Sequence, residues 1–147
     1  MKRIESHKDL IVWQKAIKLA SRVYAASRKL PHEERYGLSS QIRRAAISIP
    51  SNIAEGAARK SRAEFLQFLH IARGSLSELE TQMMIALEQE LAPSETAVLD
   101  DIAEVGRLLN GLISKLMSSN REAHADACSP FKRHQSKHSG SELTANR

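Results

Sequence analysis

The sequence predicts an all-α protein, an antiparallel up-down-up-down four-helix bundle with a disordered C-terminal tail. Apolar residues recur at spacings of three and four along four segments, which is the helical period. The apolar content is mostly Leu, Ile and Ala, whereas aromatic residues make up only 4% of the chain, too few for a typical β-sandwich. Helices of about 20 residues joined by short connections pack antiparallel, each roughly 30 Å long.

The length of 147 residues fits one domain with its own core. We expect the bundle to span residues 1–118 and the polar tail to span 119–147. No uncharged apolar stretch approaches the roughly 18 residues of a membrane span. The N-terminus lacks the apolar region of a signal peptide, so we expect a cytoplasmic protein. Cys128 is the only cysteine, which excludes an intrachain disulfide.

The first helix is predicted over residues 9–29, where two apolar stripes lie side by side. They consist of Leu10, Trp13, Ile17, Ala20 and Tyr24, and of Val12, Ala16, Leu19 and Val23. A helix with so wide an apolar face is covered on two sides, either within a bundle or by a second subunit. Pro31 ends this helix because it disfavours helical geometry at Leu30.

The second helix is predicted over residues 33–58, with Pro50 inside the pattern. Its apolar positions are Leu38, Ile42, Ala45, Ile49 and Ile53. Because the pattern keeps its phase across the proline, we expect a kink and no break.

The third helix begins at Ser61, which forms a predicted capping box with Glu64, and reaches about Glu90. A seven-residue repeat runs through it, at Phe65, Leu69, Ala72, Leu76, Leu79, Met83 and Ala86. Ser94 is the predicted N-cap of the fourth helix, which should end near Ser118. After Asn120 the periodicity stops, and a segment so poor in large apolar residues is expected to be disordered.

Charge is divided unevenly along the chain. Residues 1–73 carry 15 basic and 6 acidic side chains, whereas residues 74–117 carry 2 and 8. One interpretation is ordinary ion pairing between neighbouring helices. The other is a basic surface for a polyanion, or a head-to-tail contact in which the basic side of one subunit meets the acidic side of the next.

Two polar features stand out in the middle of the chain. A stripe on the second helix, either a solvent face or a polar contact surface, comprises Gln41, Arg44, Ser48, Asn52, Glu55 and Arg59. A set of cations, predicted to form a polyanion-binding strip, comprises Arg43, Arg44, Arg59, Lys60, Arg62 and Arg73. If the third helix runs antiparallel to the second, Arg73 is expected to come level with Arg43 and Arg44. Without interleaved aromatics, binding should be insensitive to sequence.

No catalytic constellation is apparent, so we expect no enzyme activity and no cofactor. The chain has no Glu-x-x-His pair of the kind that builds di-iron sites in bundles, and no glycine-rich phosphate loop. His134, His138 and Cys128 could in principle hold zinc, but they fall in the predicted tail, and a solvated tail is the preferred interpretation. We predict no metal site.

The string from Gln41 to Gly56, QIRRAAISIPSNIAEG, resembles the four-helix-bundle proteins related to the 23S rRNA intervening-sequence protein. The opening DLIVWQKA and the segment IARGSLSELE, residues 71–80, fit the same pattern, so the resemblance covers about residues 8–117. It implies an up-down bundle and a ring-shaped homopentamer. A similar branch, the accessory variability determinant of diversity-generating retroelements, binds nucleic acid and a reverse transcriptase.

We therefore expect a non-enzymatic, oligomeric nucleic-acid-binding or accessory protein. Its expected partners are further copies of itself, RNA or DNA, and a reverse transcriptase or another protein, with no membrane. The alternative is a protein-interaction scaffold whose charges serve assembly alone. Salt-dependent binding to RNA or DNA distinguishes the two.

Overall fold

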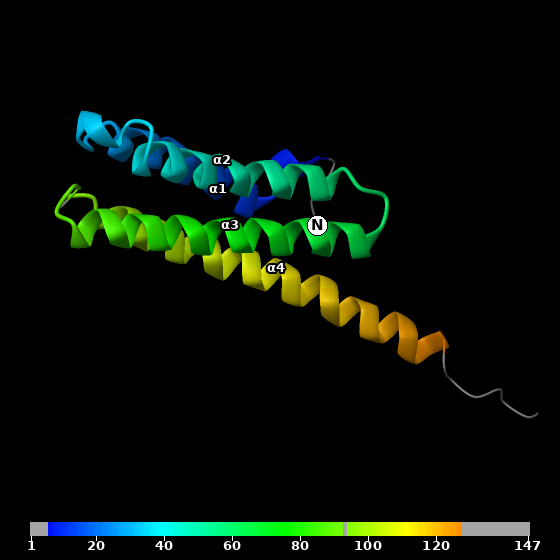
Figure 1. Cartoon of the computed structure of the whole chain (residues 1–147). Helices are drawn as coiled ribbons and strands as arrows, with labels where there is room; N and C mark the ends of the chain where they lie inside the picture. Colours follow the sequence, from blue (N-terminus) through cyan, green and yellow to red (C-terminus); the bar gives the residue numbers. More distant parts are fainter. Residues whose placement is uncertain (1–5, 93, 128–147) are drawn as a thin grey trace, which may run out of the picture.

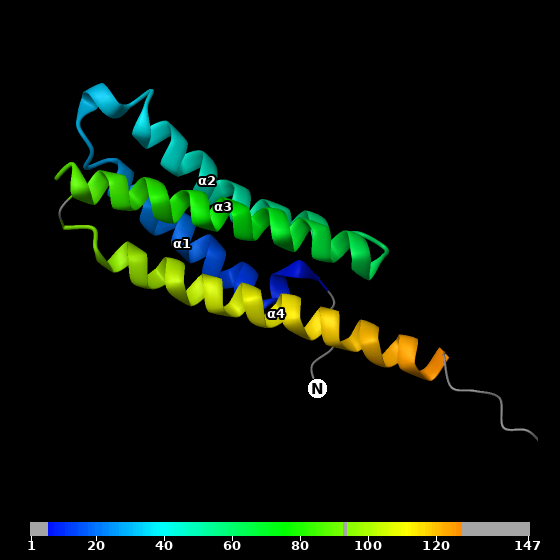
Figure 2. The ribbon, with the colours of Figure 1, turned by 60° about the horizontal axis from the view of Figure 1, so that its bottom comes forward.

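The computed structural model describes residues 6–92 and 94–127, and within them the protein is all-α. The described chain contains four long helices. Figures 1 and 2 show them packed along one another. They are α1 (Ile11–Ser27), α2 (Leu38–Ala57), α3 (Arg62–Glu88) and α4 (Ala97–Ala127), with short 3₁₀ turns η1 (His7–Asp9) and η2 (His32–Glu34) before α1 and α2. The predicted all-α class is confirmed.

Each long helix packs against two others, in the cycle α1, α2, α3, α4 and back to α1. Helices α1 and α4 run antiparallel. Lys15 pairs with Glu104, whereas Lys29, further along the chain than Lys15, pairs with Glu95, which precedes Glu104. Ser48 contacts Ser75, and Gly56 lies against Phe68, so α2 and α3 also run antiparallel. These pairings are those expected of an up-down-up-down order.

The core of α1 is the second of its two apolar stripes. Val12, Ala16, Leu19 and Val23 are buried. The first stripe lies toward α2 and is only partly covered: Trp13 is half-buried, and Ile17 is 40% exposed. One stripe of α1 thus fills the bundle core, and the other leaves apolar surface open beside α2.

Helix α2 continues through Pro50, which is buried, so the expectation that the proline would not break the helix is confirmed. The helix begins at Leu38, five residues later than predicted, because residues 32–34 form η2 instead. The carboxylate of Glu34 accepts a hydrogen bond from the Leu38 amide at 3.1 Å, which satisfies one of the free donors at the α2 N-terminus.

Helix α3 follows the predicted heptad closely. Leu69, Ala72, Leu76, Leu79, Met83 and Ala86 are all buried. At the start of α3 the Ser61 hydroxyl accepts a hydrogen bond from the Glu64 amide. The Glu64 carboxylate accepts from the Ser61 hydroxyl and not from the Ser61 amide, so only one half of the predicted capping box forms. The helix ends at Glu88, and Glu90 takes a left-handed backbone conformation with φ of 55°.

Helix α4 differs from the prediction at both ends. It begins at Ala97, three residues after Ser94, whose hydroxyl donates to the Glu95 carboxylate. It continues to Ala127, nine residues beyond the predicted end at Ser118, and Figure 1 shows its last turns extending past the other helices. The first part of the predicted tail is therefore helical. Residues 128–147, with Cys128, His134 and His138, lie outside the described residues.

In the part of the chain that the structure describes, no helix combines the length and apolar character needed to cross a membrane.

Candidate nucleic-acid interface

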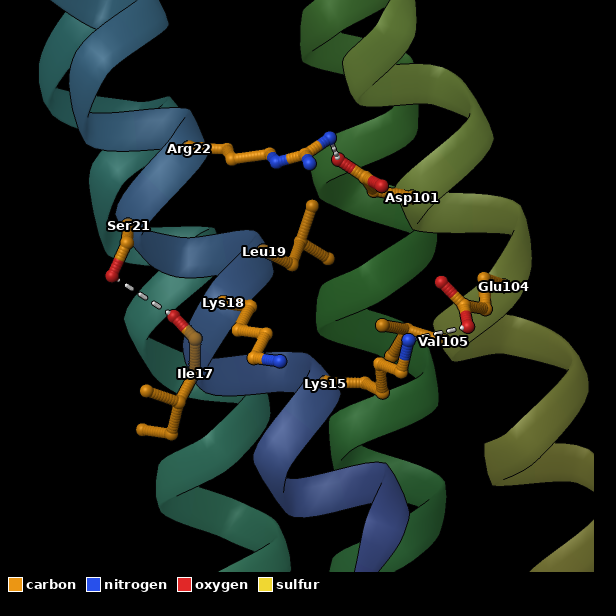
Figure 3. Close-up of a pocket in the computed structure, with 9 residues that line it drawn as sticks. All are labelled: Lys15, Ile17, Lys18, Leu19, Ser21, Arg22, Asp101, Glu104 and Val105. Atoms are coloured by element: carbon orange, nitrogen blue, oxygen red, sulfur yellow. Dashed lines mark hydrogen bonds and ion pairs between the residues drawn. The ribbon is translucent and has the colours of Figure 1, made fainter.

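Three cations in or just after α1 are paired with carboxylates in or near α4. Lys15 pairs with Glu104 at 2.9 Å, Arg22 pairs with Asp101 at 2.7 Å, and Lys29 pairs with Glu95, which precedes α4. Figure 3 shows the first two pairs bridging a groove of about 450 Å³ between the helices. This face bears out the interpretation of the charge division as ordinary pairing between neighbouring helices.

These pairs lower the pKa of two acids. The hydrogen bond from Lys29 holds the pKa of Glu95 below its usual value, aided by the Ser94 hydroxyl. The hydrogen bond from Lys15 likewise lowers the pKa of Glu104. Both carboxylates are therefore held in the charged form and balance the cations that they pair with. Lys18, which lines the same groove, and Arg107 of α4 are exposed and in no ion pair within the described residues, so this face keeps two unpaired cations.

Arg43 is directed toward α1 and is half-buried. Its Nε donates to the Ser27 hydroxyl at 2.7 Å, and its guanidinium carbon lies 5.3 Å from the centre of the Tyr24 ring. Arg44, the next residue, is exposed and lies on the opposite edge, since it precedes Ser48 by four residues and Ser48 contacts α3. The two arginines therefore do not form one patch.

Arg59 is held by its neighbours. One of its terminal nitrogens donates to Glu55 at 2.6 Å, one helical turn earlier, and its guanidinium carbon lies 4.9 Å from the centre of the Phe68 ring. It belongs both to the polar stripe and to the α2–α3 contact. Much of its charge is balanced locally by Glu55.

Lys60, Arg62 and Arg73 are exposed, and no hydrogen bond or ion pair engages their side chains within the described residues. Arg62 and Arg73 are eleven residues apart on α3, about three turns, so they share one edge of the helix. Arg62 lines a groove of about 410 Å³ together with Leu112 and Lys115 of α4. Lys115, which sequence reasoning did not single out, thus adds a cation to this edge.

The helix register differs from the expectation for Arg73. Ser75 contacts Ser48 at 2.8 Å, so Arg73 lies level with residue 50 of α2. Arg43 and Arg44 lie six or seven residues further along, about 10 Å at 1.5 Å per residue. Since residues two apart in a helix do not share a face, Arg73 also points away from the edge that Ser75 presents to α2. The expectation that these three arginines come level is wrong.

The polar stripe divides into a half-buried centre and exposed ends. Ser48 shares a hydrogen bond with Ser75, and the Asn52 amide donates to the Ser48 carbonyl and hydroxyl at 2.8 and 3.0 Å. The centre of the polar stripe thus links α2 to α3 through polar side chains. Gln41, Arg44, Glu55 and Arg59 remain exposed.

Two further surfaces were missed by sequence reasoning. An apolar groove of about 330 Å³ lies between α1 and α2, where Trp13, Ile17 and Ile47 meet. A basic pocket of about 290 Å³ lies at the α1–α2 turn, where Arg28, Arg35 and Arg43 meet. The separate cations are visible in the sequence, but their convergence depends on how the turn folds.

Comparison with known proteins gives the context for these surfaces. Residues 8–111 match the family model described as 23S rRNA-intervening sequence protein. The chain belongs to this family. All six predicted binding cations lie within the matched part, whereas Lys115 and the end of α4 lie beyond it.

A solved structure agrees with the family match. It is the crystal structure of a protein of unknown function from the S23 ribosomal protein family of Bacteroides thetaiotaomicron, with 27% sequence identity and a TM-score of 0.64. The similarity covers 70% of this chain and 98% of the other. No curated protein matches the chain. The family match and the solved structure therefore agree on the fold.

Among the described residues, no group of three or more His, Cys, Asp and Glu side chains is placed to hold a metal ion. Neither the family description nor the solved relative names an enzymatic activity.

Proposed function

We propose that this member of the 23S rRNA-intervening sequence protein family is a non-enzymatic, oligomeric protein that binds nucleic acid through α3 and the α2–α3 turn. The observation that carries the proposal is the contrast between the two faces. Lys15 and Arg22 of α1, and Lys29 just after it, are paired with carboxylates, whereas Lys60, Arg62 and Arg73 have no acidic partner within the described residues. Free Lys and Arg side chains are what a phosphate backbone requires.

The binding site is expected to read the backbone and not the bases. Lys60 and Arg62 lie beside the turn, and Arg73 lies about 16 Å further along α3 at 1.5 Å per residue. Several phosphate contacts of this kind give salt-dependent affinity with little sequence preference. Repetition of the surface in an oligomer would strengthen binding by linking weak contacts.

The test is a titration of fluorescent RNA and DNA across a range of salt concentrations. We expect Lys60→Gln, Arg62→Gln and Arg73→Gln together to reduce the slope of log K against log salt by about 2 to 3, because each phosphate contact contributes roughly 0.7 to 0.9. The control is Lys15→Gln, Arg22→Gln and Lys29→Gln together, which removes the same charge from paired positions and should change the slope much less. Equal slopes for both variants and the wild type would contradict the proposal.

Assembly into a closed homo-oligomer, a pentamer, is the second part of the proposal. Its support is the charge pattern of α3 and the connection that follows it. Residues 74–96 contain five acidic side chains and no Lys or Arg, directly after the basic segment 35–73. Only Glu95 among these acids is in an ion pair within the described residues. A head-to-tail contact between basic and acidic regions of successive copies closes into a ring when the rotation allows.

The apolar groove between α1 and α2 is the region expected to meet the next copy. Ile17 and Ile47 are 40% and 45% exposed there. Sedimentation equilibrium should give five times the chain mass of 16.4 kDa. Ile47→Lys should shift the mass toward the monomer, whereas Ile47→Met, which stays apolar, should preserve the assembly. A monomer mass for the wild type at micromolar concentration would contradict this part.

The same exposed apolar groove favours the alternative, a scaffold for another protein such as a reverse transcriptase. An intact oligomer with weak, salt-independent nucleic-acid binding would favour the scaffold.

A further inference from the structure

The α1–α2 turn and the α2–α3 turn lie at opposite ends of α2 (Figure 1). A second cationic site lies at the α1–α2 turn. The pocket of about 290 Å³ at the α1–α2 turn is lined by Arg28, Arg35 and Arg43 with His32, two serine hydroxyls, Leu30 and Pro31. No carboxylate lines it. Two acids, Glu33 and Glu34, follow the lining residue His32 in η2: Glu34 accepts a hydrogen bond from the Leu38 amide, and Glu33 is exposed.

Arg43 is held in a fixed orientation at this pocket. Its Nε donates to the Ser27 hydroxyl at 2.7 Å, and its guanidinium lies over the Tyr24 ring. The Ser27 hydroxyl in turn donates to the Tyr24 carbonyl at 2.8 Å, which orients the hydroxyl so that it accepts from Arg43. Within the described residues, the two terminal nitrogens of Arg43 have no hydrogen-bond or ion-pair partner. This half-buried guanidinium therefore presents its outer donors ready for an acceptor.

The remaining groups add positive potential around it. Arg28 and Arg35 are exposed and make no ion pair within the described chain, although Arg35 lies 5.4 Å from the centre of the Tyr36 ring. Helix α2 begins at Leu38, so the positive end of the α2 dipole lies beside Ser39, which lines the pocket. The C-terminal end of α1 opposes this field, but three guanidinium groups outweigh one partial charge.

The geometry points to a binding site for a dianionic phosphate monoester. A guanidinium matches phosphate oxygens through paired N–H donors, and three arginines around a small pocket can meet the terminal oxygens of one phosphate. Two sources carry this chemistry, a free phosphorylated small molecule and the phosphorylated 5′ end of a nucleic acid. The site is separate from the α2–α3 cations and does not depend on the proposed function.

Calorimetric titration at fixed ionic strength tests the site with inorganic phosphate, adenosine monophosphate and adenosine. We expect the two phosphates to bind and adenosine not to bind. Arg28→Gln with Arg35→Gln should weaken phosphate binding roughly 10- to 100-fold, the loss expected for charge-assisted hydrogen bonds. Both side chains are exposed, so the bundle should stay folded, which circular dichroism verifies. Arg44→Gln, which changes an exposed neighbour of Arg43 outside the pocket, should have no effect.

Oligonucleotides with a 5′ phosphate or a 5′ hydroxyl separate the two sources. A preference for the phosphorylated end that the double variant abolishes would assign the site to nucleic-acid ends, whereas monophosphate binding without that preference would assign it to small molecules. No phosphate or monophosphate binding at millimolar concentration would overturn the inference, as would unchanged binding by the double variant. The Lys60, Arg62 and Arg73 variant should retain phosphate binding, so each site can fail independently.

Discussion

Leu79→Ala should lower the free energy of unfolding by about 2–5 kcal/mol, the range measured for removing a buried leucine side chain. Leu79 is fully buried in the middle of the α3 heptad and belongs to the core cluster that all four helices share. The substitution removes the transfer energy of the lost methyl and methylene groups and leaves a cavity that rigid helices cannot fill. Urea denaturation followed by circular dichroism measures the change, with the protomer concentration held constant.

Ile85→Ala is the matched control for Leu79→Ala. It truncates an aliphatic side chain of the same helix that is 47% exposed, and it should cost less than about 1 kcal/mol. Similar losses for the two variants would show that Leu79 does not lie in a tightly packed core.

Gly56→Ala should also destabilise the fold, by about 1–3 kcal/mol, although alanine normally favours a helix over glycine. A Cβ atom at this position would lie 2.7 Å from the Cβ of Phe68 and 3.2 Å from the backbone oxygen of Phe65. These atoms cannot rotate out of the way, so α2 and α3 would have to move apart. Thermal and urea unfolding would detect the loss.

Gly74→Ala provides the opposite expectation from the same substitution. Nothing lies within 4 Å of a Cβ built at Gly74, which sits inside α3. The free energy of unfolding of the Gly74→Ala variant should rise by up to about 1 kcal/mol, because alanine restricts the unfolded chain and favours the helix. A stabilising Gly56→Ala would refute the close approach of α2 and α3.

The helices could be predicted because burial repeats along the sequence with the period of the helix. The α3 heptad predicted every buried position from Leu69 to Ala86. For α1, two stripes were visible, but their spacing alone could not tell that Val12 and Leu19 face the core while Ile17 faces the partly open side. That choice depends on where α2 and α4 pack.

The ends of α4 were missed for two reasons. Glu95 forms an ion pair with Lys29, and α4 begins at Ala97 instead of directly after the predicted N-cap Ser94. At the other end, residues 119–127 carry no large apolar side chain but are rich in alanine, so helix propensity extends α4 where the apolar pattern has stopped.

The candidate interface was harder to predict than the fold. The sequence groups six cations, but side-chain contacts separate them: Arg43 turns to Ser27 and Arg59 to Glu55. Their relative positions depend on the register of α2 and α3, which Ser48 and Ser75 fix. One residue of error in register rotates a side chain by about 100°, so no count of charges along the chain could place Arg73.

The ion pairs of α1 bear on the handedness of the bundle. Lys15, Arg22 and Lys29 lie on one edge of α1, and the Trp13–Ile17 edge lies on the other side of its core face. A mirror-image arrangement of the same four helices would exchange α2 and α4 around α1. It would place those three cations against the arginine-bearing α2 and leave Asp101 and Glu104 unpaired. Exposed ion pairs add little net stability. Because the mirror arrangement would replace attraction with charge repulsion, these three ion pairs favour the observed arrangement of the helices over its mirror image.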